Sequence, residues 1–226
     1  MCGQCGCDQP PRRQRLELHQ RLLSRNDSQA TRNRAHFRRH GLKTLNLLSA
    51  PGSGKTSLLE LLARRWPRPP IGVIVGDLAT NNDARRLEAA GARAVQIRTG
   101  DLCHLDAALV DRAFGQLDCR GLDLLVIENV GNLVCPTAFD LGEERRIAVL
   151  SVTEGEDKPL KYPALFRSAD AVVINKRDLA ELVGFDRRAA VANLRAIAPR
   201  AELFELSARC GTGIEALIAW IDGPAH

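Results

Sequence analysis

Aromatic side chains are scarce in this chain of 226 residues, at 4% of the composition. The scarcity matters most between residues 11 and 40, where nine arginines are balanced by only two acids, Glu17 and Asp27. Such a basic segment could contact nucleic acid or anionic lipid, but Phe37 is its one aromatic residue. Because stacking on bases needs aromatic rings, we interpret the segment as a solvated helix face and expect no nucleic-acid partner.

Long apolar runs are also missing. No run approaches the roughly 18 apolar residues of a membrane-spanning helix, and the first residues lack the apolar core of a secretory signal. We therefore expect no membrane contact and a cytoplasmic location. The chain has seven cysteines, and in that reducing compartment clustered thiols bind metal more often than they form disulfides.

Internal repeats and low-complexity segments are absent from the sequence, which predicts a simple organisation. We expect a flexible tail at residues 1–10, a helical extension at residues 11–41 and one large domain at residues 42–226. The extension has a helical pattern, in which Asn26-Asp27-Ser28 could interrupt the helix or cap a second one. The residues expected to face inward there are Leu16, Leu22, Leu23, Ala30 and Phe37.

The large domain alternates short apolar runs with helical patterns. Continuous apolar runs joined by helices are typical of a parallel sheet that is covered on both faces. The predicted fold class is therefore α/β, with three layers and a mainly parallel sheet of about seven strands. The expected strands are residues 45–48, 71–75, 94–97, 124–127, 147–152, 171–174 and 203–206, and the expected helices are residues 56–65, 83–90, 105–117, 187–197 and 214–221.

A phosphate-binding loop lies between the first expected strand and a helix. The segment Ser49-Ala50-Pro51-Gly52-Ser53-Gly54-Lys55-Thr56 fits the P-loop pattern G-x-x-x-x-G-K-[ST], with Ser49 in place of the first glycine. Glycines let backbone N–H groups wrap the phosphates, and the helix N-terminus adds its positive dipole end. The lysine reaches the β- and γ-phosphates, while the threonine hydroxyl ligates Mg²⁺. We assign nucleotide binding here to Gly52, Ser53, Gly54, Lys55, Thr56 and Ser57.

The base is predicted by a second motif, Asn175-Lys176-Arg177-Asp178, at the end of a late strand. The spacing N-K-x-D is the guanine-reading element of GTPases. A carboxylate at Asp178 can accept two hydrogen bonds from guanine N1–H and the exocyclic amine, a donor pair that adenine lacks. Ser207-Ala208 matches the short loop that supports the guanine carbonyl. Together these residues favour GTP over ATP.

Hydrolysis needs a metal-linked carboxylate and a sensor for the γ-phosphate. Two strand ends could supply them, one at Gly76-Asp77 and one at Glu128-Asn129-Val130-Gly131. We expect Thr56, Asp77 and Glu128 to hold Mg²⁺, and the Gly131 N–H to bond the γ-phosphate. Asp77 could instead orient the attacking water, or merely cap a helix. With Lys55, Asp77 and Glu128 as catalytic residues, the sequence predicts slow GTP hydrolysis.

Two groups of soft ligands predict metal binding. The first group is Cys2, Cys5 and Cys7, which lie within a few residues of the terminal amine. The second is Cys103-His104 with Cys135, which follow the ends of strands, where open α/β folds bind ligands. Thiolate and imidazole sets suit Zn²⁺ or Ni²⁺. The alternatives are incidental thiols in the tail and half-buried cysteines in the domain. If Cys135 is a ligand, nucleotide state and metal affinity are reciprocally coupled, because its segment extends the γ-phosphate loop.

Taken together, these motifs resemble the hydrogenase nickel-incorporation GTPases, the HypB family, over nearly the whole chain. The resemblance is carried by Cys2-x-x-Cys5-Gly6-Cys7, the P-loop, Gly76-Asp77, Thr99-Gly100 ahead of Cys103-His104-Leu105, Glu128-Asn129-Val130-Gly131-Asn132-Leu133-Val134-Cys135-Pro136 and Asn175-Lys176-x-Asp178.

The resemblance implies a GTP-dependent homodimer that delivers nickel to the [NiFe]-hydrogenase large-subunit precursor, with a small nickel- and zinc-binding accessory protein as partner. It implies a tight nickel site at Cys2, Cys5 and Cys7, and a weaker Ni/Zn site at Cys103, His104 and Cys135. Residues 156–162 resemble the family's lysine-bearing loop, from which a lysine reaches the neighbouring subunit's nucleotide. Many members carry a histidine-rich stretch that is missing here, which favours delivery over storage.

Three other functions are consistent with parts of the pattern. A related GTPase serving urease maturation shares the nucleotide motifs but not the N-terminal thiols. A metal sensor or buffer with a vestigial nucleotide site would not need intact Lys55, Thr56, Asp77 and Asp178. A small-molecule kinase would not need the guanine-reading motif.

Overall fold

The structure is a computed structural model that describes residues 12–77, 82–98, 100 and 103–224, with side chains from residue 20 onward except that of Asp77. The predicted flexible tail, and with it Cys2, Cys5 and Cys7, lies outside these residues. No helix in the described part of the chain is both long and apolar enough to cross a membrane.

A seven-stranded sheet with the order β3-β2-β4-β1-β5-β6-β7 forms the middle layer. All six neighbouring strand pairs run parallel, as the buried apolar runs predict, and the α/β fold class is confirmed. The strands are β1 (Lys43–Ser49), β2 (Gly72–Asp77), β3 (Arg93–Arg98), β4 (Leu124–Glu128), β5 (Arg145–Ser151), β6 (Ala171–Asn175) and β7 (Glu202–Glu205).

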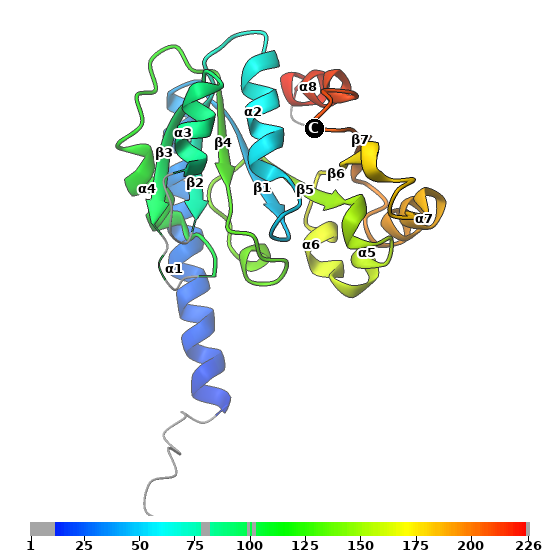
Figure 1. Ribbon diagram of the computed structural model, residues 1–226. Helices are drawn as coiled ribbons and strands as arrows, with labels where there is room; N and C mark the ends of the chain where they lie inside the picture. The colour runs from blue at the N-terminus through cyan, green and yellow to red at the C-terminus, as the bar shows by residue number, and fades with distance from the viewer. Residues whose placement is uncertain (1–11, 78–81, 99, 101–102, 225–226) are drawn as a thin grey trace, which may run out of the picture.

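Helices cover both faces of this sheet (Figure 1). On one face α2 (Lys55–Arg65), α3 (Asn82–Ala89) and α8 (Ile214–Asp222) share a core with the strands. On the other face, the last part of α1 (Arg12–Arg39) packs with α4 (Ala107–Phe114), while α6 (Pro163–Arg167) and α7 (Arg187–Ile197) cover β5 and β6. The short helix α5 (Lys158–Lys161) packs against α6 and α7. Three 3-10 turns complete the elements: η1 (Cys135–Ala138), η2 (Val152–Glu154) and η3 (Arg177–Leu179).

The extension α1 is one continuous helix of 28 residues, as the helical pattern predicts, and the interruption that Asn26-Asp27-Ser28 could cause does not occur. The polar groups that would break the helix are used otherwise. Ser28 Oγ donates back to Ser24 O (3.0 Å). Asn26 joins α1 to the loop at Asp140 and to the first residue of α4. It donates to Asp140 O (2.8 Å) and accepts from Ala107 N (2.9 Å).

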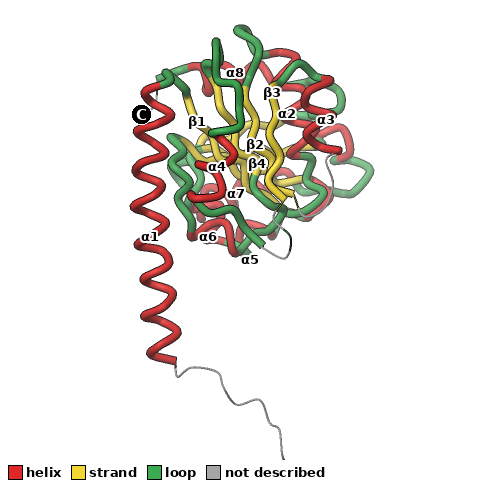
Figure 2. Tube along the Cα trace, turned by 90° about the vertical axis from the view of Figure 1, so that its left-hand side faces the viewer, coloured by secondary structure: helices red, strands yellow, loops and turns green. Residues whose placement is uncertain are grey.

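The inward positions of α1 are only partly as predicted. Ala30 and Phe37 are buried, but Leu22 is 52% exposed, and the side chain of Leu16 lies outside the described residues. Figure 2 shows the reason, because the first part of α1 runs past the domain and has no sheet beside it. The predicted helix 105–117 is also shorter, since Asp106 caps it by accepting from Leu109 N (2.7 Å).

Asn33 fastens the last part of α1 to the domain. Its side chain is 1% exposed and donates to Ala107 O (2.8 Å) and Leu141 O (3.0 Å). We expect Asn33→Ala to lower the free energy of unfolding by about 2 to 4 kcal/mol, because two buried carbonyls lose their donor. Urea denaturation measures the change. Arg32→Ala, on the exposed side of the same helix, is the control and should change it by less than about 0.5 kcal/mol. Equal effects would contradict this account of α1.

Candidate functional site

The P-loop connects the end of β1 to the start of α2, where the parallel topology collects strand ends. Ser49, which replaces the first glycine of the pattern, has a function in this structure. Its fully buried hydroxyl accepts a hydrogen bond from Lys55 Nζ (2.8 Å) and another from Ser53 Oγ (2.5 Å). The departure from the motif therefore supports the lysine instead of disrupting it.

The P-loop is locked to the guanine-reading motif, more than 120 residues away in the chain. Asn175 Nδ2 donates to Ser53 O (2.9 Å), and Lys176 Nζ donates to Gly52 O (2.6 Å). Lys176 adopts a left-handed backbone (φ 61°), which turns the chain sharply at the end of β6. Two hydrogen bonds thus join the P-loop directly to the guanine-reading motif.

Asp178 is held from the opposite side by the last strand's loop. Ser207 Oγ donates to Asp178 Oδ1 (2.5 Å), and Ala208 N donates to Asn175 Oδ1 (3.0 Å). The structure therefore brings Asn175, Asp178, Ser207 and Ala208 together, as the motifs predict.

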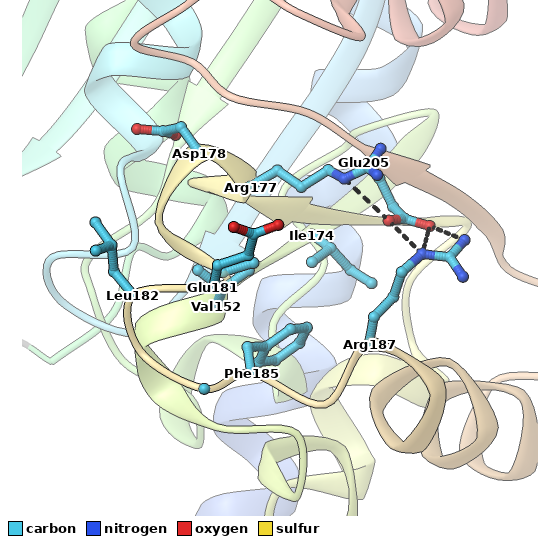
Figure 3. A pocket seen from close by; sticks show the side chains of 11 residues that line it. Val152, Ile174, Arg177, Asp178, Glu181, Leu182, Phe185, Arg187 and Glu205 are labelled. Atoms are coloured by element: carbon cyan, nitrogen blue, oxygen red, sulfur yellow. Dashed lines mark hydrogen bonds and ion pairs between the residues drawn. The ribbon is translucent and has the colours of Figure 1, made fainter.

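A cavity of about 710 Å³ is lined in part by Asp178, Phe185 and Arg187, and Figure 3 shows the Asp178 carboxylate pointing away from the other two side chains. Its neighbour Arg177 turns the other way and pairs with Glu205 (Nε–Oε2 3.5 Å). Glu205 also binds Arg187 (2.5 Å). These pairs direct the nearby positive charge away from the Asp178 carboxylate.

Two of the three Mg²⁺ ligands predicted from sequence, Thr56 and Glu128, meet at the end of β4. Thr56 Oγ1 donates to Glu128 Oε1 (2.9 Å), and Glu128 is 4% exposed at the end of β4. The Thr56 hydroxyl and the buried Glu128 carboxylate are both hard oxygen ligands, which is the ligand type that Mg²⁺ prefers. Asp77 ends the neighbouring strand β2, paired with Arg98, but its side chain is not among those described.

A cavity of about 520 Å³ lies between the P-loop and the loop after β4. Gly131 belongs to its wall, and a Cβ there would meet Pro51 at 3.0 Å, so the loop after β4 touches the P-loop. Sequence reasoning missed two lining residues, Asp83 and Arg86. Arg86 pairs with Glu60 (2.6 Å) and Asp83 (3.1 Å). No motif marks them, and only their position at the start of α3 suggests proximity to the site.

Cys103, His104 and Cys135 come together beside this loop. Cys103 Sγ lies 3.5 Å from His104 Nδ1. A hydrogen bond with Cys135, followed by burial, raises the pKa of the Cys103 thiol. His104 stacks on Phe139 with ring centroids 3.9 Å apart, and burial lowers the pKa of its imidazole. Among the described residues, no group of three or more His, Cys, Asp or Glu side chains is arranged to hold a metal ion. Metal binding by Cys103, His104 and Cys135 would therefore require these side chains to move closer together.

Comparison with known proteins places this arrangement in a family. Residues 43–205 match the nucleotide-binding domain of the CobW/HypB/UreG family. Hydrogenase maturation factor HypB of Azotobacter vinelandii is 52% identical over 211 residues, covering 92% of this chain and 69% of that protein. The chain belongs to the HypB family.

Other HypB proteins are also similar to this chain over most of its length. Hydrogenase/urease maturation factor HypB of Helicobacter pylori is 42% identical over 204 residues, covering 88% of this chain and 84% of that protein. The crystal structure of HypB from Helicobacter pylori in complex with nickel superposes with a TM-score of 0.84 at 40% identity, covering 87% of this chain and 93% of that one. The family resemblance inferred from the motifs is confirmed.

Proposed function

We propose that this chain is a GTP-hydrolysing nickel metallochaperone for [NiFe]-hydrogenase maturation. One observation carries the proposal: the end of β4 and the loop after it contribute Glu128 and Gly131 to the phosphate cavity and, four residues after Gly131, Cys135 to the thiol and imidazole group. A single segment thereby faces both the nucleotide and the cargo metal.

The nucleotide site supports binding and slow hydrolysis of GTP. Backbone N–H groups of the P-loop and Lys55 hold the phosphates, and Asp178 selects guanine. Thr56 and Glu128 would hold Mg²⁺, whose chemistry is to neutralise charge on the β- and γ-phosphate oxygens. In this proposal Asp77 orients the attacking water or completes the Mg²⁺ site, and Gly131 N–H senses the γ-phosphate.

The cargo is Ni²⁺, or Zn²⁺ in competition with it. We propose a tight site made by Cys2, Cys5 and Cys7, and a second site made by Cys103, His104 and Cys135. Thiolate and imidazole ligands suit both ions. Because the second site adjoins the γ-phosphate loop, GTP and metal change each other's affinity by the same factor.

The partners proposed from the family are a second copy of the chain, a small nickel- and zinc-binding accessory protein and the hydrogenase large-subunit precursor, all in the cytoplasm. In the lysine-bearing loop, Lys161 pairs with Asp157 (2.5 Å), and Lys158 lies 5.3 Å from the Tyr162 ring centroid. Urease maturation is the second candidate, favoured by the hydrogenase/urease name of the Helicobacter pylori relative.

Deletion of residues 2–7 tests the proposal. We expect the truncated protein to lose nickel delivery in a hydrogenase maturation assay, because its tight site is gone, while GTP hydrolysis stays within about twofold of the full chain. Replacing Gln4 alone by serine keeps the thiols and is the control. Loss of GTP hydrolysis on deletion, or unimpaired maturation, would refute a detachable metal tail.

A further inference from the structure

Two asparagines in the loop after β4 have no part in the functions assigned above. Asn129 is fully buried and uses both ends of its amide. Its Oδ1 accepts from Leu105 N (3.3 Å) and Val130 N (3.0 Å), and its Nδ2 donates to Asn46 Oδ1 (3.4 Å) on β1. This one side chain therefore joins the γ-phosphate loop to the segment that begins with Cys103-His104.

Leu105 makes that junction firm. Its side chain is fully buried, and a Cβ placed at Gly76 would approach its Cγ to 2.9 Å. Leu105 is thus wedged against the end of β2, directly before Asp77. The backbone that follows Cys103-His104 is consequently fixed to two strand ends of the nucleotide site.

Asn132 ties together the two sides of the candidate metal site. Its Nδ2 donates to Cys103 O (3.3 Å), and its Oδ1 accepts from Val134 N (2.8 Å) and Cys135 N (3.4 Å). It follows directly after Gly131, which touches the P-loop at Pro51. One amide, next in sequence to Gly131, therefore connects the backbones of both cysteines.

The far side of the same loop is anchored. Glu143 accepts from Asn46 Nδ2 (3.1 Å) and from Arg146 Nε (2.6 Å). Arg146 donates to Thr137 O (3.1 Å) and Phe139 O (3.0 Å). The Phe139 ring in turn stacks on the His104 ring. These residues are held by β1 and β5, whereas the stretch between Gly131 and Cys135 lies outside this anchored part.

We propose that Asn129 and Asn132 form an amide clamp, and that they are positioning residues which convert γ-phosphate contact into a change of metal affinity at Cys103, His104 and Cys135. The inference rests on the proposed function, which supplies the two sites. An amide is required because each position must donate and accept at once. Alanine removes all three hydrogen bonds of either asparagine, and aspartate keeps only the two accepted ones.

The test measures Ni²⁺ affinity by chelator competition, in protein whose Cys2, Cys5 and Cys7 are replaced by serine so that only the second site reports. Each protein is titrated with GDP and with a non-hydrolysable GTP analogue. We expect the two dissociation constants of the parent protein to differ by about 5- to 150-fold. In Asn132→Ala the ratio should fall to about twofold or less, while nickel affinity with GDP stays within about threefold.

Matched variants separate positioning from general damage. Gln116→Ala removes an exposed amide, which donates to Arg112 O (3.4 Å) just after α4 and outside both sites, and should keep the parent ratio. Asn132→Asp should show a reduced ratio, since its contact with Cys103 O is lost. The nickel–thiolate absorption band gives a second readout, because its nucleotide-dependent shift should disappear in Asn132→Ala.

Three results would overturn the clamp. If the parent protein responds to nucleotide and Asn132→Ala responds equally, Asn132 carries no coupling. If Asn132→Ala loses the GTP analogue itself, Asn132 is a nucleotide-binding residue rather than a positioning one. If the parent ratio is one, the coupling in the proposed function fails, and the clamp fails with it.

Discussion

Asp178→Asn should weaken GTP binding by about 100-fold, because two hydrogen bonds from guanine to a carboxylate are worth roughly 1.5 kcal/mol each and 1.4 kcal/mol is tenfold in affinity. The asparagine amide would place an N–H₂ donor against the donors of guanine. Xanthine carries a carbonyl in place of the exocyclic amine, so the variant should bind the xanthosine triphosphate more tightly than GTP. Competition against a fluorescent guanine nucleotide measures both affinities.

The fold should survive this substitution. Ser207 Oγ reaches Asp178 Oδ1 at 2.5 Å, and the asparagine oxygen can accept the same bond. Asp186→Asn is the matched control, because Asp186 caps α7 by accepting from Ala189 N (2.9 Å) and asparagine caps about as well. It should leave GTP affinity within about twofold. An unchanged GTP affinity in Asp178→Asn, or parent protein that prefers ATP, would contradict the base assignment.

The sheet is the part of the fold that local sequence predicts best. Its seven strands were each expected within two residues of their observed ends, because a strand buried on both faces reads as a continuous apolar run. Helices α5 and α6 escape prediction for the opposite reason. They have four and five residues, too few to show a helical period, and Pro159 and Pro163 suggest turns instead.

The exposure of Leu22 depends on dimensions that periodicity does not contain. A helix of 28 residues is about 42 Å long at 1.5 Å per residue, whereas the seven residues of β1 span about 23 Å. The sheet cannot cover the whole helix. An apolar residue in its first part is therefore exposed although its spacing matches the buried Ala30 and Phe37.

The candidate site, like the fold, has a part that local sequence predicts and a part that it does not. The P-loop and the Asn175-Lys176-x-Asp178 motif are local in sequence because backbone conformation and side-chain type are both fixed within a few residues. The contacts that assemble the two motifs are not local, since Lys176 and its hydrogen-bond partner Gly52 lie 124 positions apart. The amide of Asn132 likewise reaches Cys103 across 29 positions. Only the parallel topology, which gathers the strand ends, brings such pairs together.

Gly54→Ala should weaken GTP binding by about 100- to 1000-fold, a large effect for a single added methyl group. Gly54 has φ 95°, and a Cβ there would lie 2.6 Å from Asn175 Nδ2. The Asn175 side chain is 1% exposed and is bonded to Ser53 O and Ala208 N, so it cannot swing aside without breaking both bonds. Two bonds at about 1 kcal/mol each, added to left-handed strain of about 1 to 2 kcal/mol, give the expected loss.

Gly91→Ala separates the clash from the strain. Gly91 has the same φ of 95°, but a Cβ there would meet nothing within 4 Å, and it lies in the turn after α3. This control should lose about 1 to 2 kcal/mol of unfolding free energy and keep full GTP affinity. Calorimetric titration with GTP, together with urea denaturation, tests the pair. If Gly54→Ala binds GTP within about threefold of the parent protein, then Asn175 can move at little cost, and the lock between the P-loop and the guanine-reading motif does not hold the site in shape.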